Sequence, residues 1–511
     1  MLTILAKLPS HFVIGTYPMV VHYKKNIALA LIVFLPLLLI LLQGLKLSSG
    51  VFSYTLDDPY IHLALAKNIG LGNYGINLTE PSAPSSSILW PFLLAPFSYF
   101  SRYFELIPLV INACCLALLA GVIDRIFADL GLAVRLTVTA MILLSLNAYG
   151  LVFTGMEHSL QLLLVALILL PVLDNTRHDK GNYKTPSHAL LALILLPLVR
   201  YEGLAISLPM IAYTFTKGER SKALLAFGII AVSMIGFSLF VDKHGLGFLP
   251  ASVLAKSSHG GLGSTIENFK HNLLQYGFLF LPLTLVATKL WQKDRALSLV
   301  ILVSAILHFL FGKYGWFERY ANYYLLFAVL ICLRASVNMK LPVLPAILCL
   351  PLVFFSCVQA TTRTPLATSN IYHQQAQMAK IATLLAEPVA VNDLGLVALR
   401  SGQYVLDLWG LGSIDVLRYR QSNARHDWIH ELMDKKHVSY AFVYDQAFFA
   451  KPDNWTKVGE LKLLQRRITP AFDTVGLYAT GPSSIAKLSA ILKAFPQPQN
   501  DNPPFSLSIM Q

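Results

Sequence analysis

Long apolar runs alternate with short polar loops over the first two thirds of the chain. Runs close to the length of a membrane-spanning helix recur from Ile27 to Cys357. A backbone in lipid must satisfy its own hydrogen bonds, so each run is expected to form an α-helix. The pattern predicts an all-α polytopic membrane domain over residues 26–360, with about 11 transmembrane helices.

Lys and Arg residues are concentrated in alternate loops. Because cytoplasmic loops of membrane proteins are rich in these residues, the pattern assigns the two sides of the membrane. The predicted cytoplasmic set is the N-terminus 1–25 and loops 125–135, 177–184, 217–222, 289–295 and 334–340. The predicted external set is the first external loop 46–103 and the segments 151–157, 200–202, 242–271 and 312–320. Within the first external loop, the proline-broken stretch 88–100 is expected to form a short juxtamembrane or re-entrant helix.

The pattern changes after residue 360. Short apolar segments are separated by polar ones, with a polar helical stretch around residues 428–436. This alternation is typical of a small α/β domain, which the topology places outside the membrane over residues 361–495. The expected strands are 389–391, 404–406, 440–443 and 476–479. The tail 496–511 is rich in Pro and Asn and is expected to be disordered.

Composition excludes a single water-soluble core. The 511-residue chain is 55% hydrophobic and 13% charged, with a mean hydropathy of +0.58, whereas soluble domains carry about 25% charged residues. The formal net charge of +13 lies largely in the short loops, so it fits membrane topology rather than nucleic-acid binding. All five Cys residues lie in apolar runs and are expected to be buried thiols.

An acidic pair, Asp57-Asp58, follows the first apolar run and precedes Pro59. One interpretation is structural: Asp58 caps an amphipathic helix, 59–69, that lies on the membrane surface. The other is catalytic. Adjacent carboxylates repel each other, which raises one pKa into the range of a general base unless a cation neutralises the pair. Such a base could take a proton from an acceptor hydroxyl while a lipid phosphate leaves.

A leaving phosphate needs cationic partners or a metal ion. The predicted external loops supply Lys67, Arg200, Lys256 and Arg319. Each of these alone also fits a solvated charge or an interface anchor. Arg200 differs because it lies with Glu202 between two short apolar runs, where charge is costly; the two residues could also simply pair with each other.

Two further features have alternative interpretations. His62 follows Asp58 by four residues, so a contact along one helix face is expected before a metal-ligand role. Asn392-Asp393 fits either a β-turn or a contact with an acceptor glycan.

At these residues the chain resembles a known family. The run from Asp57-Asp58-Pro59-Tyr60-Ile61 through Ala66-Lys67-Asn68 to Tyr74-Gly75-Ile76-Asn77 is similar to the first-loop signature of the GT-C glycosyltransferases. Within that superfamily, the chain is most similar to the bacterial arabinofuranosyltransferase-like branch. Further motifs that resemble this branch follow in order: Gly155-Met156-Glu157, Val199-Arg200-Tyr201-Glu202-Gly203, Leu249-Pro250 with Ala255-Lys256, Glu318-Arg319-Tyr320, and Val391-Asn392-Asp393-Leu394-Gly395 with Leu406-Asp407-Leu408-Trp409-Gly410-Leu411. Tyr201 stands where the branch usually has Pro, and Leu78-Thr79-Glu80 stands where it has Pro-Gly-Glu.

The resemblance implies an inverting membrane glycosyltransferase. It would move a sugar from a polyprenyl-phosphate donor to an extracytoplasmic glycan, lipid or protein acceptor. One of Asp57 and Asp58 would be the general base, and the other would position the acceptor or bind an optional divalent cation, Mg²⁺ or Mn²⁺. Contacts with the donor phosphate or substrate would come from Lys67, Glu157, Arg200, Glu202, Lys256 and Arg319.

The implied location is the bacterial inner membrane, with the N-terminus in the cytoplasm. Membrane lipids, the lipid-linked donor and the acceptor are the expected partners, and nucleic acid is not. Two other classes of protein stay open: a polytopic transporter or flippase, and a non-catalytic assembly protein for cell-envelope polysaccharide. A transporter would carry charged or broken helices at mid-membrane, whereas most charges here lie at the ends of apolar runs.

Overall fold

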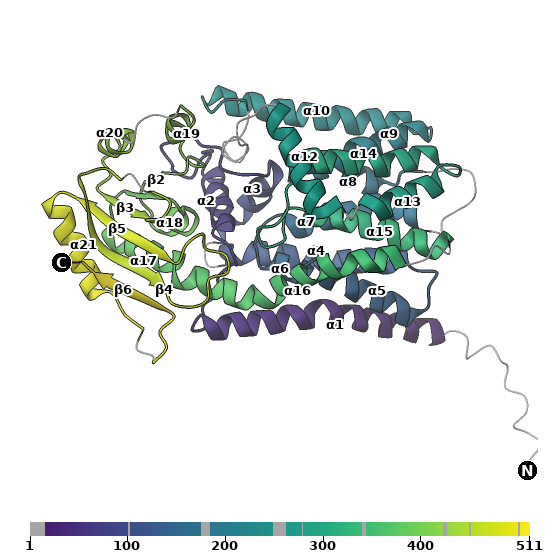
Figure 1. Cartoon of the computed structure of the whole chain (residues 1–511), viewed down its shortest axis with the longest axis horizontal. Coiled ribbons are helices and arrows are strands. Elements are labelled where there is room, and N and C mark those ends of the chain that lie inside the picture. The colour runs from purple at the N-terminus through teal and green to yellow at the C-terminus, as the bar shows by residue number, and fades with distance from the viewer. Residues whose placement is uncertain are drawn as a thin grey trace, which may run out of the picture.

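The computed structural model describes residues 16–100, 103–174, 184–248, 262–277, 280–339, 344–422, 427–448, 451–498 and 501–510. A helical domain and a smaller domain that contains a β-sheet lie end to end along the long axis of the molecule (Figure 1). The helical domain comes first in the sequence, as the hydrophobic pattern predicts.

The helical domain is built from helices of very different lengths. Their bounds are α1 (Thr16–Leu47), α2 (Asp58–Gly70), α3 (Leu89–Leu94), η1 (Ala95–Tyr99), η2 (Phe104–Leu106), α4 (Ile107–Ile126), α5 (Leu132–Ser145), α6 (Ala148–Val152), α7 (His158–Leu173), α8 (Ser187–Val199), η4 (Tyr201–Gly203), α9 (Leu204–Thr216), α10 (Arg220–Lys243), α12 (Leu262–Tyr276), α13 (Phe280–Leu290), α14 (Arg295–Phe311), α15 (Asn322–Met339) and α16 (Leu344–His373).

Some of these helices are long and apolar enough to cross a membrane. Within the described residues they are Tyr23–Leu47, Phe104–Ile126 and Arg220–Lys243. Shorter apolar helices accompany them: α5, α7, α8, α13, α14 and α15. The structure therefore agrees with a membrane protein, but these helices do not establish the expected number of about 11 spans.

The described parts of the two predicted sets of loops gather at opposite ends of the helical domain. In the basic set, ion pairs join Arg125 to Asp174 at 3.0 Å, Arg334 to Asp129 at 2.8 Å and Lys217 to Asp294 at 2.7 Å. The predicted external segments meet instead at the end next to the sheet. There α1 and α16 both arrive with their C-terminal ends (Figure 1), and Ser369 Oγ donates to the Leu47 carbonyl at 3.1 Å.

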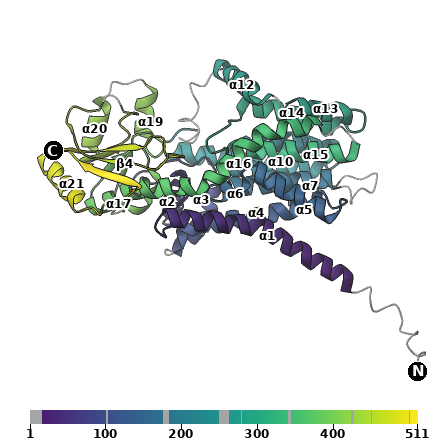
Figure 2. The ribbon, with the colours of Figure 1, turned by 60° about the horizontal axis from the view of Figure 1, so that its bottom comes forward.

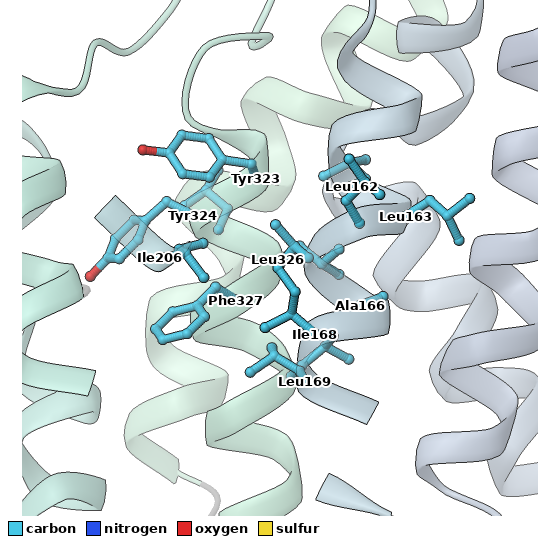
Figure 3. Close-up of a cluster of buried hydrophobic side chains, with 14 of the residues drawn as sticks. Leu162, Leu163, Ala166, Ile168, Leu169, Ile206, Tyr323, Tyr324, Leu326 and Phe327 are labelled. Carbon is cyan, nitrogen blue, oxygen red and sulfur yellow. The ribbon is translucent and has the colours of Figure 1, made fainter. Parts of the chain in front are cut away.

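Helix α7 forms the centre of the helical domain. It packs against α4, α8 and α15, and it is apolar on nearly every face, which is expected of a helix surrounded by other helices. Figure 3 shows Leu162, Ala166 and Leu169 of α7 on the side that faces Leu326 of α15. This tight packing fixes the N-terminal end of α7, where Glu157 precedes the helix.

The first-loop helix α2 is not a surface helix. Pro59 to Ala66 and Asn68 are all buried, and α2 packs against α3, η1 and α18 (Gly395–Arg400). The prediction of an amphipathic helix on the membrane surface is therefore wrong. Its sequence carries apolar residues on all faces, and the C-terminal domain covers the face that would otherwise meet lipid or water.

The C-terminal domain contains a mixed six-stranded sheet in the order β2-β1-β3-β5-β4-β6. Strand β1 (Val389–Val391) pairs in parallel with β2 (Val405–Asp407) and β3 (Tyr440–Val443). The strands β5 (Thr474–Thr480), β4 (Trp455–Leu463) and β6 (Phe505–Ile509) continue the sheet in antiparallel pairs. The four expected strands correspond to β1, β2, β3 and β5.

Helices cover both faces of this sheet. Val389 and Val391 share a buried cluster with α17 (Gln375–Leu385), α18 and α21 (Pro482–Ala494). Ala390 points to the other cluster, with α19 (Ile414–Gln421) and α20 (Asp427–Lys435). Figure 2 shows these helices on either side of the strands.

Two expectations for this part of the chain need correction. The tail is not disordered throughout, because β6 pairs with β4 from Phe505 to Ile509. Helix α16 runs without a break through residue 361, so the change of domain comes at its end near His373. The tail prediction failed because it rested on the Pro and Asn residues that precede β6, and because the partner strand β4, on which β6 depends, was not predicted.

Candidate active site

The carboxylate of Asp57 joins the first external loop to the C-terminal domain. Asp57 occupies the position before α2 but makes no capping hydrogen bond to its own helix. Its two oxygens instead accept the backbone N–H groups of Gly395 at 2.5 Å and Leu396 at 2.9 Å. These N–H groups lie at the start of α18, where a helix needs acceptors for its unpaired donors. The prediction that Asp58 caps α2 is wrong, since Asp58 is the first residue of the helix.

Gly395 allows this close approach. A Cβ atom at this position would lie 2.1 Å from the Asp57 carbonyl oxygen and 2.9 Å from Asp57 Oδ2. Real side chains do not tolerate such distances, so the contact requires glycine at residue 395.

The neighbouring acid, Asp58, pairs with a buried arginine. Arg319 Nη2 donates to Asp58 Oδ2 at 2.5 Å, and the side chains are 2% and 35% exposed respectively. Nη2 also donates to the Tyr320 hydroxyl at 3.0 Å, and the guanidinium lies 4.9 Å from the centre of that ring. Arg319 Nε and Nη1 are buried and have no hydrogen-bond partner among the described residues. Two donors of a buried cation are therefore available for a ligand.

An unusual turn places Arg319. Gly315, Trp316, Phe317 and Glu318 all have positive φ angles, a conformation that costs about 1–2 kcal/mol for each residue with a side chain. Asn147 Nδ2 donates to the Phe317 carbonyl at 3.0 Å and supports the turn. Strained backbone of this kind is common at functional sites, where the surrounding fold enforces it.

A second arginine lies beside this pair. Arg200 donates to Glu157 at 2.7 Å and to Glu202 at 2.9 Å. It also lies 5.6 Å from the centre of the Tyr320 ring, so both guanidinium groups approach that side chain. The fold thus connects Asp58, Arg319, Tyr320, Arg200 and the two glutamates, which come from four predicted external segments.

Other predicted site residues are not placed in this group. Lys67 is exposed on α2, and no described ion pair joins it to Asp58. Lys256 lies outside the described residues. His62 is buried, and its Nδ1 lies 3.2 Å from Ser85 Oγ, which gives it a structural partner.

The C-terminal domain adds a third carboxylate that the site prediction omitted. Asp393 follows β1, and its Oδ2 accepts from the Tyr444 hydroxyl at 2.5 Å and from Gln375 Nε2 at 2.8 Å. Burial and then the negative charge of Asp393 raise the pKa of Asp57. Burial also raises the pKa of Asp393, against its hydrogen bonds, and the Asp58 charge adds to this. The sequence feature that could have indicated Asp393 is the polar pair Asn392-Asp393, which directly follows the central strand β1.

The contacts do not favour a metal ion at the acidic pair. Both oxygens of Asp57 accept backbone N–H groups, and Asp58 already faces a guanidinium. Within the described ranges, no three Asp, Glu, His or Cys side chains form a group that could hold a metal. The optional Mg²⁺ or Mn²⁺ expected at Asp57 and Asp58 therefore has no suitable set of ligands among the described residues.

Comparisons with known proteins give little that bears on function. A family described as "Domain of unknown function (DUF8728)" matches residues 369–478, from the end of α16 through most of the C-terminal domain. No curated protein matches the chain. Among solved structures, the oligosaccharyltransferase of Archaeoglobus fulgidus, in a complex with Zn and sulfate, is similar over 90% of this chain and 77% of that chain. The identity is 11% and the TM-score 0.39, a level of likeness on which we build no argument.

Proposed function

We propose that this protein is a membrane glycosyltransferase that uses a polyprenyl-phosphate sugar as donor. One observation carries the proposal. A partly exposed acid, Asp58, lies in contact with a buried arginine, Arg319, that keeps two unused hydrogen-bond donors. Transfer of a sugar from a phosphate needs a base for the acceptor hydroxyl and a cation that can stabilise the leaving phosphate. Asp58 and Arg319 are suited to these two roles. The resemblance of the first loop to GT-C glycosyltransferases supports the same reaction.

Arg319 is the proposed site of the donor phosphate. Guanidinium groups bind phosphate through their charge and their N–H donors, and Nε and Nη1 of Arg319 lack a hydrogen-bond partner among the described residues. Arg200 is a weaker candidate because its single positive charge already faces Glu157 and Glu202. We therefore assign Arg200 and its two glutamates to the positioning of Tyr320 and Arg319.

Asp58 is the proposed general base. The acceptor hydroxyl oxygen would form a bond to the anomeric carbon, while the bond from that carbon to the phosphate oxygen breaks. The hydroxyl proton passes to Asp58, and the electron pair of the broken bond stays on the polyprenyl phosphate, beside Arg319. One displacement of this kind inverts the anomeric carbon.

Donor binding would also activate the base. In the free protein, the Arg319 charge stabilises the Asp58 carboxylate and lowers its basicity. A phosphate bound at Nε or at Nη1 would neutralise part of that charge, so Asp58 would become a better base only when the donor is present. Asp57 acts differently: we assign it to holding α18 and the first loop in register.

The test is a transfer assay on purified full-length protein with synthetic polyprenyl-phosphate pentoses and hexoses. Asp58→Asn should lower turnover by about 10²–10⁴-fold, the usual contribution of a general base. Glu105→Gln is the control, because it changes a carboxylate in η2, just after the first external loop, that pairs with Arg400 rather than with Arg319. Equal turnover in wild type and Asp58→Asn would rule out the base. Lipid or sugar flux that survives loss of both aspartates would favour a transporter.

We also propose that the protein lies in the bacterial inner membrane and that transfer to the acceptor takes place on the extracytoplasmic side. The polar cluster lies at the end of the helices that the charge pattern assigns to the exterior. Cysteine labelling of exposed loop residues in intact cells would check the orientation, with labelling at residue 99 and none at residue 293 as the expected result.

A further inference from the structure

Three parallel strands end at the edge of the C-terminal sheet that contacts the first external loop. Strand β1 lies between β2 and β3. The chain leaves β1 through α18 to reach β2 on one side, and it later reaches β3 on the other side, so the strand order reverses at β1. In open sheets of this type, ligands bind beyond the carboxyl ends of the strands at such a reversal.

Polar side chains follow β1 and β3 at this edge. Asn392 and Asp393 come after β1, and Tyr444 comes after β3. Asn392 Oδ1 accepts the Tyr444 N–H at 2.8 Å, which ties the two strand ends together. Tyr444 and Gln375 then fix Asp393 through its Oδ2 atom.

Two acceptor atoms remain at this edge. Asp393 Oδ1 has only a long contact, 3.5 Å, with Asn392 Nδ2 among the described residues. Gln375 is 1% exposed, and its Oε1 is buried without a hydrogen-bond partner in the described part of the chain. A buried acceptor without a donor, such as Gln375 Oε1, is costly, and Oδ1 of the half-buried Asp393 can accept a further hydrogen bond, so a ligand that fits here carries hydrogen-bond donors. Hydroxyl groups of a saccharide meet that requirement.

The first external loop brings its acids to the same place. Asp57 binds the N–H groups of Gly395 and Leu396, which follow Asp393 by two and three residues. Asp58 is the next residue in the chain, so an acceptor that reaches Asp393 lies at the boundary where Asp58 acts. Asp57 and Asp58 come from the first external loop and Asp393 from the C-terminal domain, and the three do not form a metal-binding group within the described residues.

We propose that Asp393 is an acceptor-positioning residue that the C-terminal domain contributes to the active site. It accepts a hydrogen bond from one hydroxyl of a saccharide acceptor and thereby holds another hydroxyl at Asp58. This inference rests on the proposed glycosyl transfer. It adds that the acceptor is a saccharide and that the C-terminal domain takes part in binding it.

The experiment compares Asp393→Asn with Asp445→Asn in the full-length protein. Asp445 also follows β3, but it pairs with Lys457 at 2.8 Å and Tyr478 at 2.6 Å and serves as the matched control. Transfer to a panel of alkyl glycosides and hydrolysis of the donor by water are measured together. Asp393→Asn should raise the KM for the acceptor by about 10- to 100-fold, the size of one hydrogen bond to a charged group. Donor hydrolysis should stay within about twofold of wild type, since water needs no positioning by Asp393.

The outcomes separate this inference from the function on which it rests. An unchanged acceptor KM in Asp393→Asn overturns the positioning role, and so does an equal loss of transfer and hydrolysis together with a lower Tm. If wild type has neither activity, the proposed function fails, and calorimetric titration with the same glycosides still tests Asp393. Weaker binding to Asp393→Asn than to Asp445→Asn supports the site, and equal binding rules it out.

Discussion

The side-chain amide of Asn77 forms two hydrogen bonds with the backbone of Val405. Its Nδ2 donates to the Val405 carbonyl and its Oδ1 accepts the Val405 N–H, both at 2.9 Å. Strand β2, which contains Val405, is at one edge of the sheet. Asn77 therefore pairs with the open edge as a neighbouring strand would, and the first loop becomes part of the C-terminal domain.

Replacement of Asn77 by Asp should loosen this attachment. The acceptor is kept, but the second oxygen faces the Val405 carbonyl without a donor, which costs about 1–3 kcal/mol for a buried group. We expect a lower Tm for the purified protein in detergent. Asn73→Asp is the control, because Asn73 is exposed and its side chain makes a long 3.4 Å bond to Leu71 within its own loop. Equal Tm values for the two variants would contradict a structural role for the Asn77 contact.

Gly395→Ala should separate Asp57 from α18. The added Cβ would meet the Asp57 backbone oxygen at 2.1 Å, and overpacking of this kind costs about 1–3 kcal/mol. The expected results are a lower Tm and slower transfer. In contrast, Gly121→Ala lies in α4 with nothing within 4 Å of the added atom, so its Tm should equal or exceed that of wild type. A wild-type Tm in Gly395→Ala would show that the domains do not dock as described.

Arg319→Lys tests the geometry of the phosphate site. Lys keeps the charge but has neither Nε nor Nη1, so the donor phosphate loses the N–H donors that the buried guanidinium offers it. We expect kcat/KM for the donor to fall by about 10- to 100-fold, a loss of about 1.4–2.7 kcal/mol of transition-state binding. Arg400→Lys changes an exposed pair with Glu105 and should have little effect. A wild-type kcat/KM for the donor in Arg319→Lys would rule out the proposed role of Arg319 in binding the donor phosphate.

The stability of the site should depend on pH through Asp57 and Asp393. Both pKa values are raised in the folded protein, first by burial, whereas Asp in unfolded chains titrates near about 4. The folded state then holds these protons to higher pH than the unfolded state. Their contribution to stability is complete below about pH 4 and is lost as the pH rises through the raised values.

The measurement is the difference in Tm between Asp393→Asn and wild type from about pH 5 to about pH 9. Because Asn does not ionise, the Tm of Asp393→Asn should rise relative to the Tm of wild type as the pH rises. For Asp445, burial is outweighed by bonds from Lys457 and Tyr478, which lower the pKa. The Asp445→Asn difference should therefore stay flat over the same range. Parallel Tm curves for Asp393→Asn and wild type would contradict the raised pKa.

Local sequence was enough to predict several elements. The start of α2 beside Pro59 and the position of β1 and β3 follow from turn residues and short apolar runs. The grouping of loops followed from their Lys and Arg content. For α2, β1 and β3, the residues that specify the element lie within it or next to it. The grouping of loops depends on whether a residue meets lipid or water, and not on contacts with distant parts of the chain.

Contacts between distant segments could not be predicted in the same way. Asp57 and Gly395 are separated by 338 positions, and no periodicity in the sequence reports that α18 presents its N–H groups there. The burial of α2 and the strand β6 depend in the same way on surfaces that other segments provide.

The sequence by itself determined that the chain forms apolar helices followed by an α/β domain, and that an acidic pair opens the first external loop. Only the tertiary structure decided how the two acids differ: Asp57 binds α18, and Asp58 faces Arg319. The physical reason is that hydrophobic patterning depends on neighbours along the chain, whereas the environment of a carboxylate depends on the donors and charges that folding brings to it.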